Sequence, residues 1–306
     1  MRVAAATALL AIVLLAGCSG AKTRPPATAA AGHGHGAGGR GHASGGGAAD
    51  RFHDDIDLPQ STRYRDNSDS VPGTAPDVSK LAEPVPKVEP RSLYGNKSPY
   101  TVLGRTYRVL PSARGYDERG IASFYGSKFH GYKTSNLETY DMYAFTAASK
   151  TLPLPSYARV TNLQNGKSVI VRVNDRGPFH ENRLIDLSFA AAVKIGIWPK
   201  GTGLVEVRGI DPASPARELP PPGVVRGGHP GIYLQVGAFS DVANAERLAQ
   251  RLRQANLGNV QVLDAQVNGR HVRRVRVGPL PDVDQADRIS ARIEAMGLPP
   301  PQVAVD

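Results

Sequence analysis

The chain has 306 residues, with 33 Gly, 25 Pro and a single Cys, and its formal net charge is +10. This length accommodates one or two modest domains, and the high Gly and Pro content predicts that part of the chain is linker. A single cysteine excludes a disulfide framework within the chain, and the absence of a dense basic stripe with interleaved aromatic residues disfavours a nucleic-acid binder.

The first 17 residues are typical of a bacterial signal peptide. Arg2 precedes an apolar stretch over residues 3–15, which is too short to span a membrane comfortably as a helix. Residues 15–18 (Leu-Ala-Gly-Cys) resemble a lipobox, which implies cleavage before Cys18 and lipidation of that cysteine. The acyl chains would anchor the protein, and Ser19 after the cysteine points to the outer membrane. An ordinary signal peptide with a chance cysteine is the alternative.

Residues 18–114 are predicted to form a lipidated and mostly disordered tether. The low-complexity stretch 29–49 cannot bury enough apolar surface to offset its ordering entropy. Its histidines could bind a metal weakly, or they could be incidental in a flexible segment. These histidines are His33, His35 and His42. Residues 72–90 are Pro-spaced and should be extended, whereas the alternation over 98–110 predicts a hairpin at the entrance to the first domain.

Residues 115–210 are predicted to form a mainly β domain with one or two short helices. Its short β-rich runs suit a closed barrel, because closure removes exposed sheet edges. Asn165-Gly166 predicts a hairpin with a type I′ turn. Ser188 is a candidate N-cap for a helix over 189–197, with Gly196 near its end.

A Pro-rich linker is predicted over 211–228, followed by a second domain over 229–306. The order of elements in this domain is β-α-β-β-α-β, which favours a two-layer α+β sandwich. Asp241 is a candidate cap for a helix over 242–257, and residues 268–269 (Asn-Gly) should join two strands.

Residues 120–207 resemble the catalytic domain of the RlpA (rare lipoprotein A) family of endolytic peptidoglycan transglycosylases. The resemblance is carried mainly by GIASFYGSKFHGYKTSN, TAASKTLPLP, NDRGPF and IDLS. It implies a double-psi β-barrel. YLQVGAFSDVANAERLAQRL and VRRVRVGPLPD resemble a SPOR domain, which implies binding to septal glycan strands stripped of their stem peptides. The order of lipobox, tether, barrel and SPOR domain is similar to that of the same family.

The resemblance implies a lytic transglycosylase active in cell separation, lipid-anchored and facing the periplasm. Such an enzyme breaks the MurNAc–GlcNAc bond without water, because the C6 hydroxyl of the sugar attacks C1 and leaves a 1,6-anhydro end. One carboxyl group can therefore act first as acid and then as base. Ordinary glycosidases instead need two carboxyl groups.

The family's functional positions correspond to Glu138, Ser149 and Asp175 in this chain. Ser149 stands where the family often has His, and Leu137 stands where it often has Gly. We predict Asp175 to be the catalytic acid, unless it only closes its turn or pairs with Arg176. We predict Glu138 to orient the substrate or to stabilise positive charge, and the alternative is a solvated loop acid.

Further residues are predicted to bind the substrate through hydroxyl, carboxylate, guanidinium or aromatic groups. They are Asp141, Ser149, Arg176, Asp186 and Tyr125. Asp186 could instead cap the helix that begins near Ser188, and Tyr125 could belong to the core.

In the second domain, the predicted glycan-binding residues are Gln235, Arg274 and Arg276. The two arginines share one face of a strand, because strand side chains alternate. A solvated sheet face is the alternative.

No pair of ligands has convincing metal spacing, and we predict neither a metal nor a cofactor. A non-catalytic, expansin-like septal lipoprotein that binds glycan without cutting it is the alternative function, and Ser149 and Leu137 favour it. The sequence does not identify protein partners.

Overall fold

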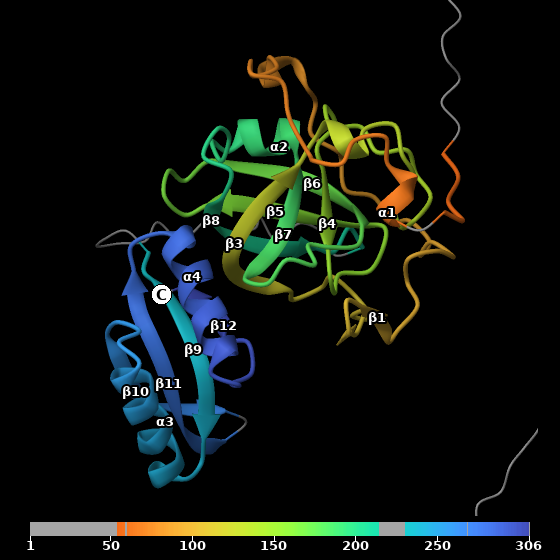
Figure 1. Cartoon of the computed structure of the whole chain (residues 1–306). Helices are drawn as coiled ribbons and strands as arrows, with labels where there is room; N and C mark the ends of the chain where they lie inside the picture. The colour runs from red at the N-terminus through yellow and green to blue at the C-terminus, as the bar shows by residue number, and fades with distance from the viewer. Residues whose placement is uncertain (1–53, 59, 214–229, 268, 306) are drawn as a thin grey trace, which may run out of the picture. The chain divides into compact units, whose positions relative to one another are not determined.

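The computed structural model describes residues 54–58, 60–213, 230–267 and 269–305 (Figure 1). Cys18 and the His-rich stretch lie outside these residues. In the described part of the chain, no helix has the length and apolar character needed to cross a membrane.

The central domain is a closed six-stranded barrel, as predicted (Figure 1). Its strands are β3 (Asp117–Tyr125), β4 (Thr146–Ser149), β5 (Ser156–Asn162), β6 (Ser168–Asp175), β7 (Arg183–Ser188) and β8 (Gly203–Ile210). The order around the barrel is β3-β7-β4-β6-β5-β8, with β3/β7 and β4/β6 parallel and the other pairs antiparallel. Alternate residues of β6, namely Val169, Val171 and Val173, are buried in the barrel core, as the period of a strand requires.

The short helix α2 (Phe189–Lys194) follows β7 directly and confirms the predicted cap. The Ser188 hydroxyl accepts a hydrogen bond from the Ala191 amide at 3.3 Å, and Gly196 takes a positive φ of 72° after the helix. Because Ser188 fills the cap position, Asp186 is not needed there.

The β5–β6 hairpin at Asn165-Gly166 is confirmed, but its turn differs from the predicted type I′ turn. Gly166 has a φ of 72°, whereas Asn165 is not among the described residues with positive φ. The strand pairs end at Thr161↔Ser168, which leaves a loop longer than two residues. The Asn165 side chain instead donates to the carbonyl of Ile195 at 3.0 Å, so it ties the loop to the end of α2.

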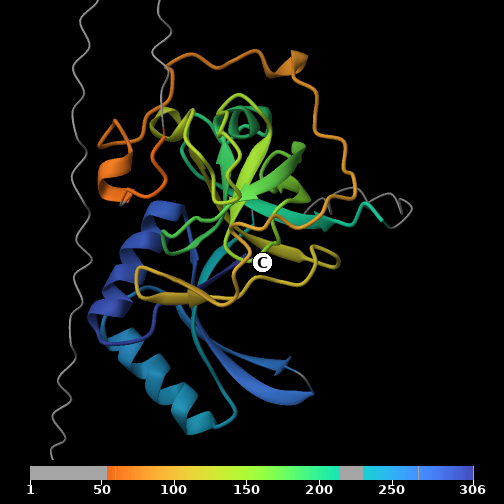
Figure 2. The same cartoon turned by 90° about the vertical axis from the view of Figure 1, so that its right-hand side faces the viewer.

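The segment ahead of the barrel, residues 60–114, contains the short helices α1 (Gln60–Arg63) and η1 (Val78–Lys80). A hairpin of β1 (Tyr100–Val102) and β2 (Arg105–Tyr107) confirms the one predicted over 98–110. Figure 2 shows this segment, coloured orange to yellow, passing along the barrel.

This segment contacts the barrel at several points, although the sequence predicts it to be part of the tether. Asp69 accepts hydrogen bonds from the amides of Gly126 and Lys128. The Asn96 side chain donates to the carbonyl of Leu154 and accepts from its amide. These contacts join residues 57 or more positions apart in the sequence, so no local sequence pattern predicts them. The domain boundary at residue 115 stays a prediction.

The C-terminal module has the predicted β-α-β-β-α-β order (Figure 1). Its elements are β9 (Ile232–Phe239), α3 (Val242–Gln254), β10 (Val260–Val267), β11 (Arg270–Leu280), α4 (Val283–Ala295) and β12 (Gln302–Val305). The antiparallel sheet has the order β10-β11-β9-β12. Asp241 caps α3 as predicted, and Asp282 caps α4. Both helices pack on the sheet face that carries Leu234 and Val275, forming one core.

Candidate functional site

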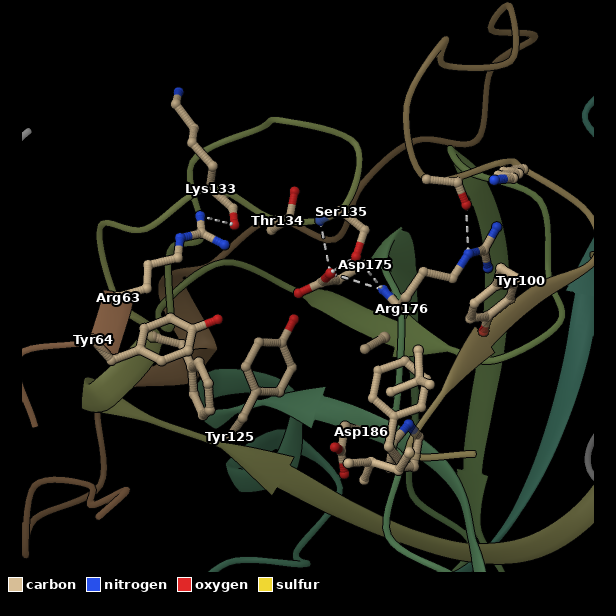
Figure 3. Close-up of a pocket in the computed structure, with 18 of the residues that line it drawn as sticks. Arg63, Tyr64, Tyr100, Tyr125, Lys133, Thr134, Ser135, Asp175, Arg176 and Asp186 are labelled. Atoms are coloured by element: carbon tan, nitrogen blue, oxygen red, sulfur yellow. Dashed lines mark hydrogen bonds between the residues drawn. The ribbon is translucent and has the colours of Figure 1, made fainter. Parts of the chain in front are cut away.

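A cavity of about 740 Å³ lies beside strands β4, β6 and β7 (Figure 3). Ala148 is paired with Asp175 on one side and with Asp186 on the other. The two aspartates therefore flank one strand, with Cα atoms about 10 Å apart, which is two strand spacings. Both carboxyl groups line the cavity.

Asp175 lies where β6 ends and is held through one carboxyl oxygen. Its Oδ1 accepts hydrogen bonds from the Ser135 amide at 2.8 Å, the Ser135 hydroxyl at 2.6 Å and the Arg176 amide at 2.8 Å. Figure 3 shows the second oxygen pointing away from these donors into the cavity. Because three donors occupy Oδ1, a proton on this carboxyl group belongs on Oδ2, which faces the cavity.

Burial raises the pKa of Asp175 above its ordinary value, and the hydrogen bonds from Ser135 and Arg176 offset only part of that rise. Burial likewise raises the pKa of Asp186, although the hydroxyl of Ser123 donates to it. Two carboxyl groups with raised pKa therefore share one cavity, and a raised pKa suits a general acid.

Tyr125 lines the same cavity, but its ring is also a core residue. The ring stacks on Tyr140 with centroids 4.1 Å apart and is 7% exposed. Figure 3 shows its hydroxyl directed toward Asp175. The ring of Tyr125 therefore packs in the core, and substrate binding through its hydroxyl stays a prediction.

Glu138 is absent from the described residues that line this cavity. It closes a turn over 134–138, in which the Thr134 amide donates to the Glu138 carbonyl at 2.8 Å. Its carboxylate accepts from Asn136 at 2.9 Å, from Asn174 at 3.0 Å and from Arg172. Burial opposes ionisation, but the hydrogen bonds from Arg172 and Asn174 outweigh it and hold the pKa of Glu138 below its ordinary value.

Arg172 connects Glu138 to the segment ahead of the barrel. Its Nε and Nη2 donate to the two carboxylate oxygens of Glu89, at 3.0 and 2.9 Å, while its Nη1 pairs with Glu138. Tyr157 also donates to Glu89. The hydrogen bonds from Arg172 lower the pKa of Glu89. A bidentate pair of this kind fixes geometry as well as charge.

Ser149 is 2% exposed, and its hydroxyl accepts hydrogen bonds from the amides of Thr151 at 3.3 Å and Leu152 at 3.2 Å. These contacts make it a turn-stabilising residue. It is not among the described residues that line the cavity, although its neighbour Ala148 is.

Arg176 lines the cavity but binds protein groups. Its guanidinium donates to the carbonyls of Gly95 at 2.6 Å, Ser149 at 3.0 Å and Leu152 at 2.5 Å, and to the Asn96 side chain at 3.2 Å. Burial lowers the pKa of Arg176 to about 10. The residue therefore joins the segment ahead of the barrel to the β4 region next to Asp175.

Asp141 lies away from this cavity, on an exposed loop. Its carboxylate accepts from the Tyr143 amide at 2.9 Å and lies 3.7 Å from His130 Nδ1. Within the described residues, no group of three or more His, Cys, Asp or Glu is arranged to hold a metal ion.

In the C-terminal module, Gln235 of β9 is paired with Arg276 of β11 and with Gln302 of β12. Arg274 lies two positions before Arg276, and Val275 between them is buried in the core. Alternation therefore puts both arginines and Gln235 on the sheet face opposite the helices.

Sequence reasoning did not identify three residues of this region. Ser135 supplies two hydrogen bonds to Asp175, Glu89 holds Arg172, and Tyr64 lines the cavity. Ser135 sits in the quoted TSN segment and could have been found from it. Glu89 and Tyr64 lie in a stretch without periodicity, where no local signal marks them.

Comparison with known proteins gives a consistent result. A family profile described as lytic transglycolase matches residues 117–208, and a SPOR domain profile matches residues 228–303. The endolytic peptidoglycan transglycosylase RlpA of Pseudomonas aeruginosa is 40% identical over 289 residues, covering 77% of this chain and 84% of the relative. The protein of the same name from Vibrio cholerae is 41% identical over 235 residues, covering 77% and 86%. The crystal structure of the P. aeruginosa RlpA SPOR domain matches 24% of this chain and 97% of that chain, at 32% identity and a TM-score of 0.24.

Proposed function

The chain belongs to the RlpA family of endolytic peptidoglycan transglycosylases, and we propose that it cleaves MurNAc–GlcNAc bonds in peptide-stripped septal peptidoglycan. The products are glycans with 1,6-anhydroMurNAc ends. The observation that carries this proposal is Asp175, a carboxyl group with a raised pKa whose second oxygen faces a cavity of about 740 Å³.

Asp175 is the catalytic residue of this proposal. Its protonated Oδ2 donates the proton to the glycosidic oxygen as the bond to C1 breaks. The resulting carboxylate then accepts the proton of the C6 hydroxyl while O6 forms a bond to C1. The proton returns to Asp175, no water is consumed, and the enzyme is ready for another cycle. Burial supports the first step, because it favours the protonated acid.

Glu138 is a positioning residue in this proposal. Its lowered pKa makes it a carboxylate at neutral pH, and its hydrogen bonds go to Asn136, Asn174 and Arg172. Asn136 follows Ser135, which holds Oδ1 of Asp175. Glu138 therefore acts on Asp175 through the 134–138 turn. The sequence had suggested direct contact with the sugar.

Asp186 and Tyr125 are the substrate-binding residues that the geometry supports, because both line the cavity with Asp175. Arg176 supports the site through its contacts with backbone carbonyls. For Asp141 and Ser149 the contacts support structural roles in their loops.

Four basic residues line the cavity, and this property supports a peptide-stripped substrate. They are Arg63, Lys97, Lys133 and Arg176, against the acidic Asp175 and Asp186. Removal of the stem peptide leaves the lactyl group of MurNAc as a free carboxylate. Arg63 is paired with Asp54, and Arg176 donates to backbone carbonyls. Lys97 and Lys133 are therefore the basic residues of the lining that would attract such an anion.

The C-terminal module binds the same glycan strands in this proposal. Gln235 and Arg274 supply an amide and a guanidinium group on one sheet face, where Arg276 is only 7% exposed. These groups suit the hydroxyl and carbonyl oxygens of a glycan.

The protein acts at the periplasmic face of the outer membrane, near the division septum, in this proposal. The lipobox-like sequence at Cys18 and the Ser19 that follows support the lipid anchor. Cys18 lies outside the described residues. The SPOR domain match supports enrichment at septal peptidoglycan.

A non-catalytic glycan-binding protein is the second candidate, and Ser149 is the observation that favours it. A serine cannot replace an imidazole as a proton carrier at neutral pH. The buried hydroxyl of Ser149 serves the turn, so no second proton carrier is supplied from this position.

The test uses the chain without residues 1–18 and sacculi treated with an amidase. Mass spectrometry of the released glycans should show 1,6-anhydro ends with the wild type. Asp175→Asn should lower their formation about 100- to 10,000-fold, the range for loss of a general acid. Asp141→Asn is the matched control, since Asp141 is an exposed acid outside the cavity. Intact glycans with tight binding by the wild type would instead support the non-catalytic candidate.

A further inference from the structure

One wall of the cavity around Asp175 comes from outside the barrel. Arg63 and Tyr64, which precede the barrel by about fifty residues, line the cavity together with the β1–β2 hairpin. We propose that Tyr64 is a substrate-contacting residue whose phenol binds a peptidoglycan sugar beside Asp175. This inference rests on the proposed function, and it concerns residues outside the 117–208 match to the lytic transglycolase profile.

The ring of Tyr64 is fixed by aromatic contacts with the barrel. Its centroid lies 4.9 Å from that of Phe129 and 5.0 Å from that of Tyr132, both in edge-to-face geometry. The ammonium group of Lys128 lies 5.6 Å from the ring centroid. Such contacts stabilise the orientation of an aromatic ring. The sugar would therefore meet a side chain that is already oriented.

The backbone next to Tyr64 is held by a buried ion pair. Asp54 accepts from Arg63 Nε at 2.8 Å and from the Lys133 amide at 2.6 Å, while Arg63 Nη2 donates to the Lys133 carbonyl at 2.8 Å. The side chains of Arg63 and Asp54 are only 11% and 5% exposed. Lys133 lies two residues before Ser135, the residue that holds Asp175. Residues 133–135 therefore contact both Arg63, next to Tyr64, and the catalytic acid Asp175.

The hydroxyl of Tyr64 is directed at the reacting region. Figure 3 shows the Tyr64 and Tyr125 hydroxyls on the same side of the cavity, both directed toward Asp175. Burial raises the pKa of Tyr64, so the group is a neutral phenol at physiological pH. A phenol both donates and accepts hydrogen bonds, which matches the hydroxyl and acetamido groups of a GlcNAc or MurNAc unit.

Two substitutions distinguish the contribution of the Tyr64 hydroxyl from that of its aromatic ring. Tyr64→Phe keeps the aromatic contacts and removes one hydrogen bond, so KM for soluble amidase-treated glycan should rise about fivefold with little change in kcat. Tyr64→Ala removes the aromatic ring from the cavity wall as well, and it should lower kcat/KM at least about tenfold. The control is Tyr94, a 56% exposed tyrosine of the same segment that does not line the cavity. Tyr94→Phe and Tyr94→Ala should match the wild type.

A second measurement reports contact with Tyr64 independently of chemistry. Full-length Asp175→Asn protein labelled with 3-fluorotyrosine is titrated with soluble amidase-treated glycan, and the Tyr64 signal is assigned by Tyr64→Phe. The fluorine signal of Tyr64 should shift on binding, and the signal of Tyr94 should not. A shift of the Tyr64 signal, with no anhydro product from the wild type, would contradict the proposed reaction but support the contact between Tyr64 and glycan. An unmoved Tyr64 signal, together with wild-type kcat/KM for Tyr64→Ala, would overturn the inference.

Discussion

At the scale of single residues, Asp175 shows how burial and hydrogen bonding compete at one carboxyl group. Burial raises its pKa, and three hydrogen bonds to Oδ1 lower it by less. The folded state therefore binds a proton more tightly at this group than the unfolded chain does. Each pKa unit of this difference corresponds to about 1.4 kcal/mol.

Asp175→Asn should consequently stabilise the protein as the pH rises. Below the unfolded pKa of about 3.8 both states of the wild type are protonated, and the variant gains nothing. Above this unfolded pKa, the free energy of unfolding of the wild type falls with rising pH until the pH passes the raised pKa of Asp175 in the folded state. The variant has a neutral Asn at this position and undergoes no such loss. Urea unfolding between pH 3.5 and 7.5 measures the difference. Asp141→Asn, in an exposed loop, is the control, and a variant that is less stable than the wild type at pH 7 would contradict the argument.

At the scale of elements, the turn over 134–138 carries more of the site than its sequence suggests. It presents Ser135 to Asp175 on one side and is closed by Glu138 and its partners on the other. Leu137, which stands where the family often has Gly, has a φ of 66° in this turn. A left-handed conformation costs an L-residue about 1–2 kcal/mol.

Leu137→Gly should therefore raise the free energy of unfolding, by about 0.5–1 kcal/mol once the greater flexibility of Gly in the unfolded chain is subtracted. Leu137→Ala is the matched control, because it removes the side chain but keeps the strained backbone. Urea denaturation of both variants measures the effect. Equal stabilisation by Ala and Gly would show that the side chain, and not the backbone, is responsible.

Most elements could be predicted from the sequence because their signals are local. Ser188 and Asp241 cap helices as their positions indicated, and the β5–β6 hairpin forms at Asn165-Gly166. The cavity wall could not be predicted in this way. Arg176 reaches Gly95 across 81 positions, and no periodicity links the two residues. Glu138 shows the same limit, since only the folded turn reveals that its carboxylate faces Arg172 and Asn174.

At the scale of the whole molecule, the proposed function has two glycan-binding modules, joined by the Pro-rich linker that the sequence predicts over residues 211–228. When one module holds a strand, the linker confines the other to a small volume around it. The second binding event is then intramolecular, and its effective concentration is set by linker length. We expect the intact chain to cleave amidase-treated sacculi faster than the same two modules unlinked.

A protease site inserted between residues 213 and 230 tests this expectation on one preparation, assayed before and after cleavage. Cutting the linker should lower the rate on amidase-treated sacculi at least about tenfold, because linkage contributes about 100-fold or more to avidity. Short soluble glycans that fill only the barrel cavity should be cleaved equally well by both forms, which controls for damage to the site. An unchanged rate on sacculi after complete cleavage would mean that the two modules do not engage one strand together.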